Sequence, residues 1–194
     1  MSKPFRASRT SGYVALFLLL AAGAIFVYWR VAADKTPGAY EVRKGNYRLE
    51  DGQYEEALEQ FDLALEADSE SVRAFQGISV TYLQMGRLEE AVEVFSKILT
   101  LDPSYATAYA DRGIALDRLG RHEEALKDYR KAVEVEPDIV KGPGFLWRFM
   151  RNISEKPPSI QQRADYIEAE LKKPAEERKL SLPEQDDEQR MYKR

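Results

Sequence analysis

Three stretches of the sequence, spaced 34 residues apart, decide the fold. Residues 52–65 read GQYEEALEQFDLAL, residues 86–99 read GRLEEAVEVFSKIL, and residues 120–133 read GRHEEALKDYRKAV. A glycine, a glutamate pair, a small residue and an aromatic residue recur at the same places in each stretch. The sequence therefore contains an internal repeat, with units at 38–71, 72–105 and 106–139.

Each unit predicts a pair of helices. In unit two the first helix has apolar residues at helical spacing, Phe75, Ile78 and Tyr82, and it is expected to end at Gly86, because glycine adopts the left-handed conformation at little cost. The second helix has one apolar face and contains the small residue Ala91. Since a single hairpin cannot bury its own apolar face, the units must stack. We predict an all-α protein, an α-solenoid of three helical hairpins.

Small residues are expected where the two helices of a hairpin approach each other. On this pairing Ser79 faces Ala91 and Gly113 faces Ala125, which leaves room for the aromatic residue of the same unit, Tyr129 in unit three.

The spacing of small, aromatic and proline residues resembles the tetratricopeptide repeat family. The resemblance covers about half of the chain and is most specific in units two and three, where Pro103 and Pro137 follow the second helix. Unit one departs from it, because Glu41 and Lys44 replace apolar residues and Ser69 replaces the proline. Its first helix is expected to be the exposed end of the stack, or to have a shifted register.

A basic N-terminal segment, residues 1–12, precedes an apolar run. Residues 13–29 read YVALFLLLAAGAIFVYW without a charge, a helix of roughly 26 Å against the ~30 Å of a bilayer core. We predict a transmembrane helix over 13–30 and a linker over 31–37. The flanking basic residues keep the N-terminus cytoplasmic and place the repeats on the exported side, periplasmic in a bacterium. The alternative is a signal peptide cleaved after Val31-Ala32-Ala33, which gives a secreted protein.

The C-terminal third is predicted to cap the stack. In residues 140–173, the apolar cluster 145–150 covers the end of unit three or, alternatively, touches the membrane. Ser159 and Gln162 form a capping box for a short amphipathic helix that Pro174 ends. Residues 174–194 are mostly charged and predict a mobile tail.

Charge and composition exclude several classes of function. Residues 38–139 hold 12 basic and 22 acidic residues, a net charge of −10, which disfavours nucleic acid as a partner. The chain has no cysteine, and His122 aligns with Tyr54 and Leu88, so a packing role is expected for it. The glutamate pairs recur at each second helix, where carboxylates complement the helix dipole. No catalytic set can be assembled, and we predict no enzyme activity, cofactor, metal or small-molecule substrate.

The resemblance implies that the first helices line a concave groove for a peptide. By alignment its residues are Val42, Asn46 and Leu49 of unit one, Arg73, Gln76, Val80, Leu83 and Gln84 of unit two, and Ala110, Ile114, Asp117 and Arg118 of unit three. The subtype that clamps chaperone C-terminal carboxylates needs lysines, an arginine and asparagines at set positions. Only Asn46 fits, since Val42, Gly77, Thr107 and Asp111 stand at the others.

These features together predict a membrane-tethered scaffold that binds another polypeptide, such as an assembly factor for an envelope complex. Affinity is expected to come from apolar anchors in the groove, with arginines and glutamines setting orientation. The alternative is an exported structural protein that self-associates through its stack and apolar cap.

Overall fold

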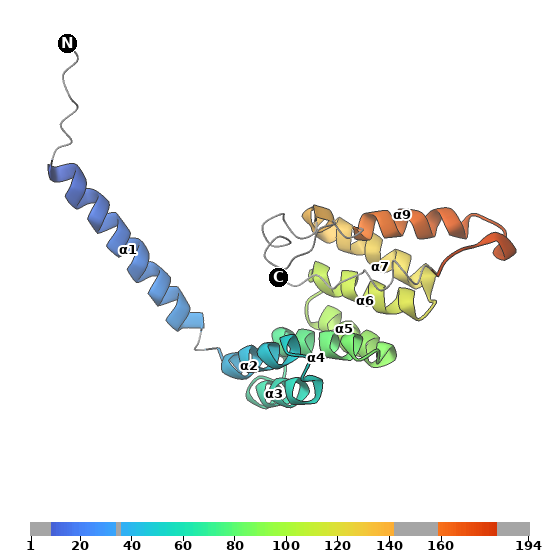
Figure 1. Ribbon diagram of the computed structural model, residues 1–194, viewed down its shortest axis with the longest axis horizontal. Helices are drawn as coiled ribbons and strands as arrows, with labels where there is room; N and C mark the ends of the chain where they lie inside the picture. The colour runs from blue at the N-terminus through green and yellow to red at the C-terminus, as the bar shows by residue number, and fades with distance from the viewer. Residues whose placement is uncertain (1–8, 34–35, 142–158, 182–194) are drawn as a thin grey trace, which may run out of the picture.

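The computed structural model describes residues 9–33, 36–141 and 159–181, and within these ranges every regular element is a helix (Figure 1). In chain order the elements are α1 (Arg9–Ala33), α2 (Ala39–Glu50), α3 (Tyr54–Ala67), α4 (Val72–Gln84), α5 (Leu88–Leu101), α6 (Ala106–Arg118), α7 (His122–Val135), η1 (Pro137–Lys141), α9 (Ile160–Leu171) and η2 (Ala175–Glu177).

The predicted hairpins are confirmed. Each unit is a helix pair, α2 with α3, α4 with α5 and α6 with α7, and the pairs stack in chain order (Figure 1). The turns contain Gly52, Gly86 and Gly120, with φ of 74, 75 and 76°. In each turn the residue after the glycine donates its amide to a carbonyl five residues earlier, as Arg87 does to Tyr82 at 2.9 Å. Glycine is required here because other residues rarely adopt this conformation.

One buried ring joins the first two units. Phe61 of α3 is fully buried between Gly45 of its own hairpin and Gly77 of the next. A Cβ at Gly45 would lie 2.6 Å from Phe61 Cε1, and a Cβ at Gly77 would also overlap the ring. The register of unit one is therefore that of the other units and is not shifted.

In unit three the predicted pairing of Gly113 with Ala125 is confirmed. A Cβ at Gly113 would lie 2.8 Å from the ring of Tyr129 and 3.4 Å from the carbonyl oxygen of Ala125. Tyr129 is fully buried. The small residue in the first helix therefore makes room for the aromatic residue of the second.

α1 extends away from the stack (Figure 1). Its large apolar side chains are exposed, including Phe17 and Leu19, each 71% accessible. In the ranges that the structure describes, no helix combines the length and the apolar character that a membrane span requires. The transmembrane helix over 13–30 stays a prediction.

α9 covers the last repeat by packing on α7. Its predicted capping box is confirmed, because Ser159 Oγ accepts the amide of Gln162 at 3.3 Å and the Ser159 amide donates to Gln162 Oε1 at 2.9 Å. The predicted turn at 142–144 and the apolar cluster at 145–150 lie outside the described residues.

The predicted mobile tail needs a correction. Residues 175–177 form η2, and residues 178–181 return along α9, where Leu180 packs against the core. The segment is ordered because its main chain bonds to α9 side chains, as described below. Residues 182–194 lie outside the described residues.

Candidate peptide-binding surface

The first helices of the three units form the inner wall of the stack. The first helices contact one another, α2 with α4 and α4 with α6. The second helices α3, α5 and α7 make fewer contacts with one another. Helices that approach one another more closely lie on the inside of a curved stack. The inner wall is therefore the concave side, on which the sequence predicts the groove.

The twelve predicted groove residues divide into two groups. Asn46, Arg73 and Arg118 are exposed, and Gln76 and Gln84 are partly exposed. The other seven are buried: Val42, Leu49, Val80, Leu83, Ala110, Ile114 and Asp117.

Burial changes the expected role of the apolar members. Leu83 is 2% and Ile114 is 1% accessible, so both belong to the core rather than to an open trough. These side chains are buried because the inner positions of one first helix also face the neighbouring first helix. The expectation of several apolar anchors is therefore corrected, and the accessible members of the set are polar.

The accessible polar residues are partly fixed by neighbours. Gln76 Oε1 accepts a hydrogen bond from the hydroxyl of Tyr105 at 2.6 Å, which ties α4 to the residue that precedes α6. The Gln76 amide nitrogen sits in an orientation set by this bond, since the amide group is planar. A partner on the inner wall thus meets a pre-oriented amide.

Asp117 lies in a buried ionic cluster that the sequence did not predict. Its carboxylate accepts two hydrogen bonds from Arg163 of α9, Nε to Oδ2 at 2.6 Å and Nη2 to Oδ1 at 2.9 Å. His122 Nδ1 lies 2.8 Å from Asp117 Oδ1, and the hydroxyl of Tyr129 lies 3.4 Å from Oδ2. The side chains of Asp117 and Arg163 are 0% and 2% accessible. Asp117 therefore closes the end of the inner wall instead of facing a partner.

His122 needs a correction for the same reason. The alignment with Tyr54 and Leu88 predicts packing, and the side chain is indeed only 14% accessible. Its ring also bonds to Asp117, a contact that the other units lack because Leu49 and Leu83 stand at the position of Asp117. The cluster forms because α9 places Arg163 against Asp117, although the two residues are 46 positions apart in the sequence. No repeat pattern could predict this contact.

A second ion pair lies within unit three, and its arginine also bonds to unit two. Arg112 of α6 donates Nε and Nη2 to the carboxylate of Asp128 at 2.7 and 2.8 Å, and Nη1 to Ser96 of α5 at 2.9 Å. The hydrogen bond that Arg112 donates to Asp128 raises the pKa of Arg112, against the opposing effect of burial. Arg112 therefore stays charged and connects α6 to both α5 and α7.

The glutamate pairs take the places predicted for them. Glu55-Glu56, Glu89-Glu90 and Glu123-Glu124 lie in the first turns of α3, α5 and α7. Arg121 bonds to Glu124 and lowers the pKa of that carboxyl. Across the described residues, no group of three or more metal-binding side chains comes together.

Comparisons with known proteins support the prediction of tetratricopeptide repeats. Two tetratricopeptide repeat family models match the chain, one over residues 48–111 and one over residues 106–139. The chain therefore contains tetratricopeptide repeats, a module of protein–protein interaction. No curated protein matches the chain in sequence.

Solved structures are similar over the same region. The first repeat domain of Spaghetti (RPAP3), bound to the HSP90 peptide SRMEEVD, is 28% identical with a TM-score of 0.51, and the match covers 61% of this chain and 90% of that one. The second repeat domain of the same protein, with the same peptide, is 29% identical with a TM-score of 0.50, over 55% and 99%. The Arabidopsis OM64 repeat domain is 24% identical with a TM-score of 0.51, over 53% and 84%, and supports the fold alone.

Proposed function

We propose that this chain, which carries tetratricopeptide repeats, is a membrane-tethered scaffold that binds a polypeptide along the inner wall of α2, α4 and α6. The observation that carries the proposal is the accessible row of Asn46, Arg73, Gln76, Gln84 and Arg118 on that wall. Amides and guanidinium groups can bond to the main chain and polar side chains of an extended peptide. The similar repeat domains of RPAP3 were solved with a bound peptide.

The partner differs in chemistry from the HSP90 peptide that RPAP3 holds. A terminal carboxylate needs positive charge around it. At the clamp positions this chain has Val42, Gly77, Thr107 and the buried carboxylate of Asp111. The inner wall of this chain therefore favours an internal, extended segment over an acidic C-terminus.

Site-specific crosslinking tests the binding surface. A photoreactive residue at Asn46 or Gln84 in intact cells should trap one defined polypeptide. The matched control is the same residue at Glu59, which is exposed on α3, away from the inner wall. Equal crosslinking from Glu59 and Gln84, or crosslinks to bulk protein only, would reject the proposal.

The membrane tether is the second component of the proposal. It rests on the charge-free run of residues 13–29 and on the exposed apolar side chains of α1. An exposed apolar helix of this kind is stable in lipid and costly in water. We place the repeats on the exported side, as an assembly factor for an envelope complex. Alkaline extraction of membranes tests the tether, because an anchored chain stays in the pellet whereas a chain cleaved after Ala33 is released.

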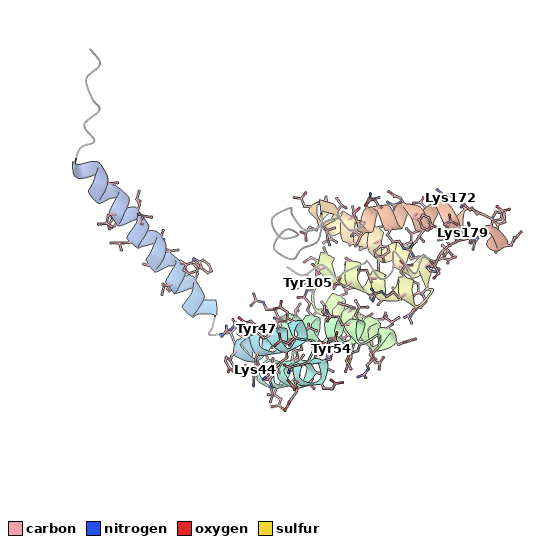
Figure 2. All side chains as sticks on the ribbon, viewed as in Figure 1. Lys44, Tyr47, Tyr54, Tyr105, Lys172 and Lys179 are labelled. Carbon is pink, nitrogen blue, oxygen red and sulfur yellow. The ribbon has the colours of Figure 1, made fainter. Side chains whose placement is uncertain are left out.

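A second candidate function is self-association, which one observation favours. Tyr40 and Tyr47 of α2, the first helix of the stack, are 63% and 69% accessible. Figure 2 shows Tyr47 on this helix. The same repeat positions are occupied in unit two by Ala74 and Thr81, and in unit three by Ala108 and Ala115, and these four are at most 1% accessible. A second copy could cover the tyrosines. Light scattering of a fragment from Asp34 onward tests this, and a strict monomer rejects it.

A further inference from the structure

Residues 178–181 run in an extended conformation along α9 and are held mainly through their main chain. Arg178 has φ −71° and ψ 132°, which is extended backbone. The hydroxyl of Tyr166 donates to the carbonyl of Lys179 at 2.7 Å, and the amide of Lys179 donates to Glu170 Oε2 at 2.8 Å. Arg163 Nη2 donates to the carbonyl of Leu180 at 2.9 Å. Three polar groups of the main chain, two of Lys179 and one of Leu180, are thus bonded to α9.

Two side chains of the segment are held as well, since Arg178 Nε donates to the carbonyl of Lys173 at 2.9 Å and Leu180 packs against the core. Leu180 is partly buried and packs against the core, whereas Arg178, Lys179 and Ser181 are exposed. Figure 2 shows Lys179 on the returning segment and Lys172, which directly follows α9. Main-chain hydrogen bonds combined with a pocket for one apolar side chain are the elements by which proteins bind extended peptides.

The three α9 residues that make these bonds are themselves fixed. Arg163 is anchored on Asp117, with the Tyr166 ring centroid 5.6 Å from its guanidinium carbon. Glu170, whose side chain is 7% accessible, accepts Lys173 Nζ at 2.5 Å. They lie at spacings of three and four residues, hence on one face of α9. A face whose donors and acceptors are already oriented binds with a smaller entropy cost.

We propose that Arg163, Tyr166 and Glu170 form a binding site for an extended peptide with a leucine-like side chain, and that residues 178–181 are its intramolecular occupant. The site lies on α9, beyond the three repeats, and adjoins the inner wall through Asp117. The proposal goes beyond the repeat groove and needs no partner of that groove for its test. A tethered segment competes at an effective concentration in the millimolar range, so outside peptides bind well only when it is displaced.

Fluorescence anisotropy on the full chain in detergent micelles tests this proposal. The probe is a labelled synthetic peptide of residues 176–183, EERKLSLP. The variant Leu180→Asp releases the intramolecular segment, and it should bind the probe saturably, roughly tenfold or more tighter than the natural sequence does. The matched control is Ser181→Asp, which adds the same charge at an exposed neighbour and should behave like the natural sequence.

Further variants separate recognition from general adhesion. In the Leu180→Asp background, Tyr166→Phe removes one hydroxyl and should weaken probe binding severalfold. A probe with the same Leu180→Asp change should not bind. A folded Leu180→Asp chain that leaves the probe free would overturn the proposal, as would equal binding of both probes.

Hydrogen exchange of the natural sequence covers the case in which Leu180→Asp does not fold. The Lys179 amide should exchange faster than the amides of the middle of α9, because the segment opens while the helix stays intact. Excess unlabelled EERKLSLP should speed that exchange further by occupying the vacated site. Protection of Lys179 equal to that of the α9 core amides would mean that the segment is a permanent part of the fold.

Discussion

Arg163 of α9 and Asp117 of α6 form a buried ion pair with two hydrogen bonds, of 2.6 and 2.9 Å. The pair joins the capping helix to the last repeat. Arg163 also holds the carbonyl of Leu180, so a single guanidinium connects the repeat stack, the cap and the returning segment. This contact therefore couples the last repeat to both the cap and the returning segment.

Removing one partner of this pair should destabilise the protein strongly. Asp117→Ala leaves the Arg163 charge buried without its carboxylate, and we expect a loss of about 3–5 kcal/mol in the free energy of unfolding. The control is Asp165→Ala, which breaks an exposed contact of the same cap with Arg130 and should cost only a small fraction of that. Urea denaturation measures both, and similar losses would contradict the assigned role of Asp117.

Glu170 should give the returning segment a dependence on pH. The hydrogen bond from Lys173, followed by that from the Lys179 amide, lowers the pKa of Glu170 from its ordinary 4.5. A carboxyl with a lowered pKa stabilises the folded state above its unfolded pKa and loses this contribution as pH falls through the folded value. The stability difference between the natural sequence and Glu170→Gln should be constant from pH 7 to pH 5 and shrink below 4.5. Denaturation across this range checks it, and a difference that grows toward acid would contradict it.

Overpacking a hairpin should destabilise the stack. Ala91 of α5 is fully buried, and α5 packs on α4, so we expect Ala91→Leu to force the two helices apart, at a cost of roughly 1–3 kcal/mol. Glu93→Leu introduces the same side chain on the exposed face of α5 and should leave the melting temperature nearly unchanged. Calorimetry distinguishes the two variants. An unaltered melting temperature for Ala91→Leu would refute the helix pairing.

Charged substitutions on the inner wall should separate folding from binding. Leu83→Asp places a charge at a site that is 2% accessible and should unfold the domain. Gln84→Glu changes the adjacent, partly exposed residue and should reduce partner capture while the circular dichroism melt stays the same. Pull-down and melting are measured on the same preparations. Partner capture that survives Gln84→Glu combined with Arg118→Glu would move the binding surface elsewhere.

The HSP90 peptide SRMEEVD should not bind to the inner wall. The positions that hold a terminal carboxylate in clamp repeats lack cations here, because Val42, Gly77, Thr107 and Asp111 occupy them. Calorimetric titration of the full chain with this peptide should show no saturable heat, with an RPAP3 repeat domain as the positive control. Saturable binding would show that the inner wall does bind a C-terminal carboxylate and would contradict this prediction.

The repeat region could be predicted from the sequence because its physical constraint is periodic. Gly113 must be small where the Tyr129 ring packs, and the same demand recurs at Gly45 with Phe61. The 34-residue spacing therefore fixed both the hairpins and their order. The contact of Gly77 was not predicted, because Gly77 makes room for Phe61 of the preceding unit. The predicted pairing considered only contacts within one hairpin.

The cap and the binding surface were predictable only in part. Arg163 reaches Asp117 across 46 positions, and nothing periodic links them. Residues 178–181 look like a charged tail because three of the four are polar, yet their main chain carries the contacts. Leu83 and Ile114 were assigned to an open groove because family alignment marks a helix face, while their burial depends on how closely the adjacent helix approaches.

The two ends of the stack are chemically unlike. At one end α9 and its arginine complete the last unit, whereas at the other the aromatic rings of Tyr40 and Tyr47 stand where every later unit has alanine or threonine. A duplicated unit placed ahead of Gly38 would pack against the two tyrosine rings, at positions where the other units have small residues. A unit inserted at residue 106 would pack against such small residues on both sides. Lengthening of this molecule during evolution is therefore favoured from the middle of the array and opposed at its N-terminal end.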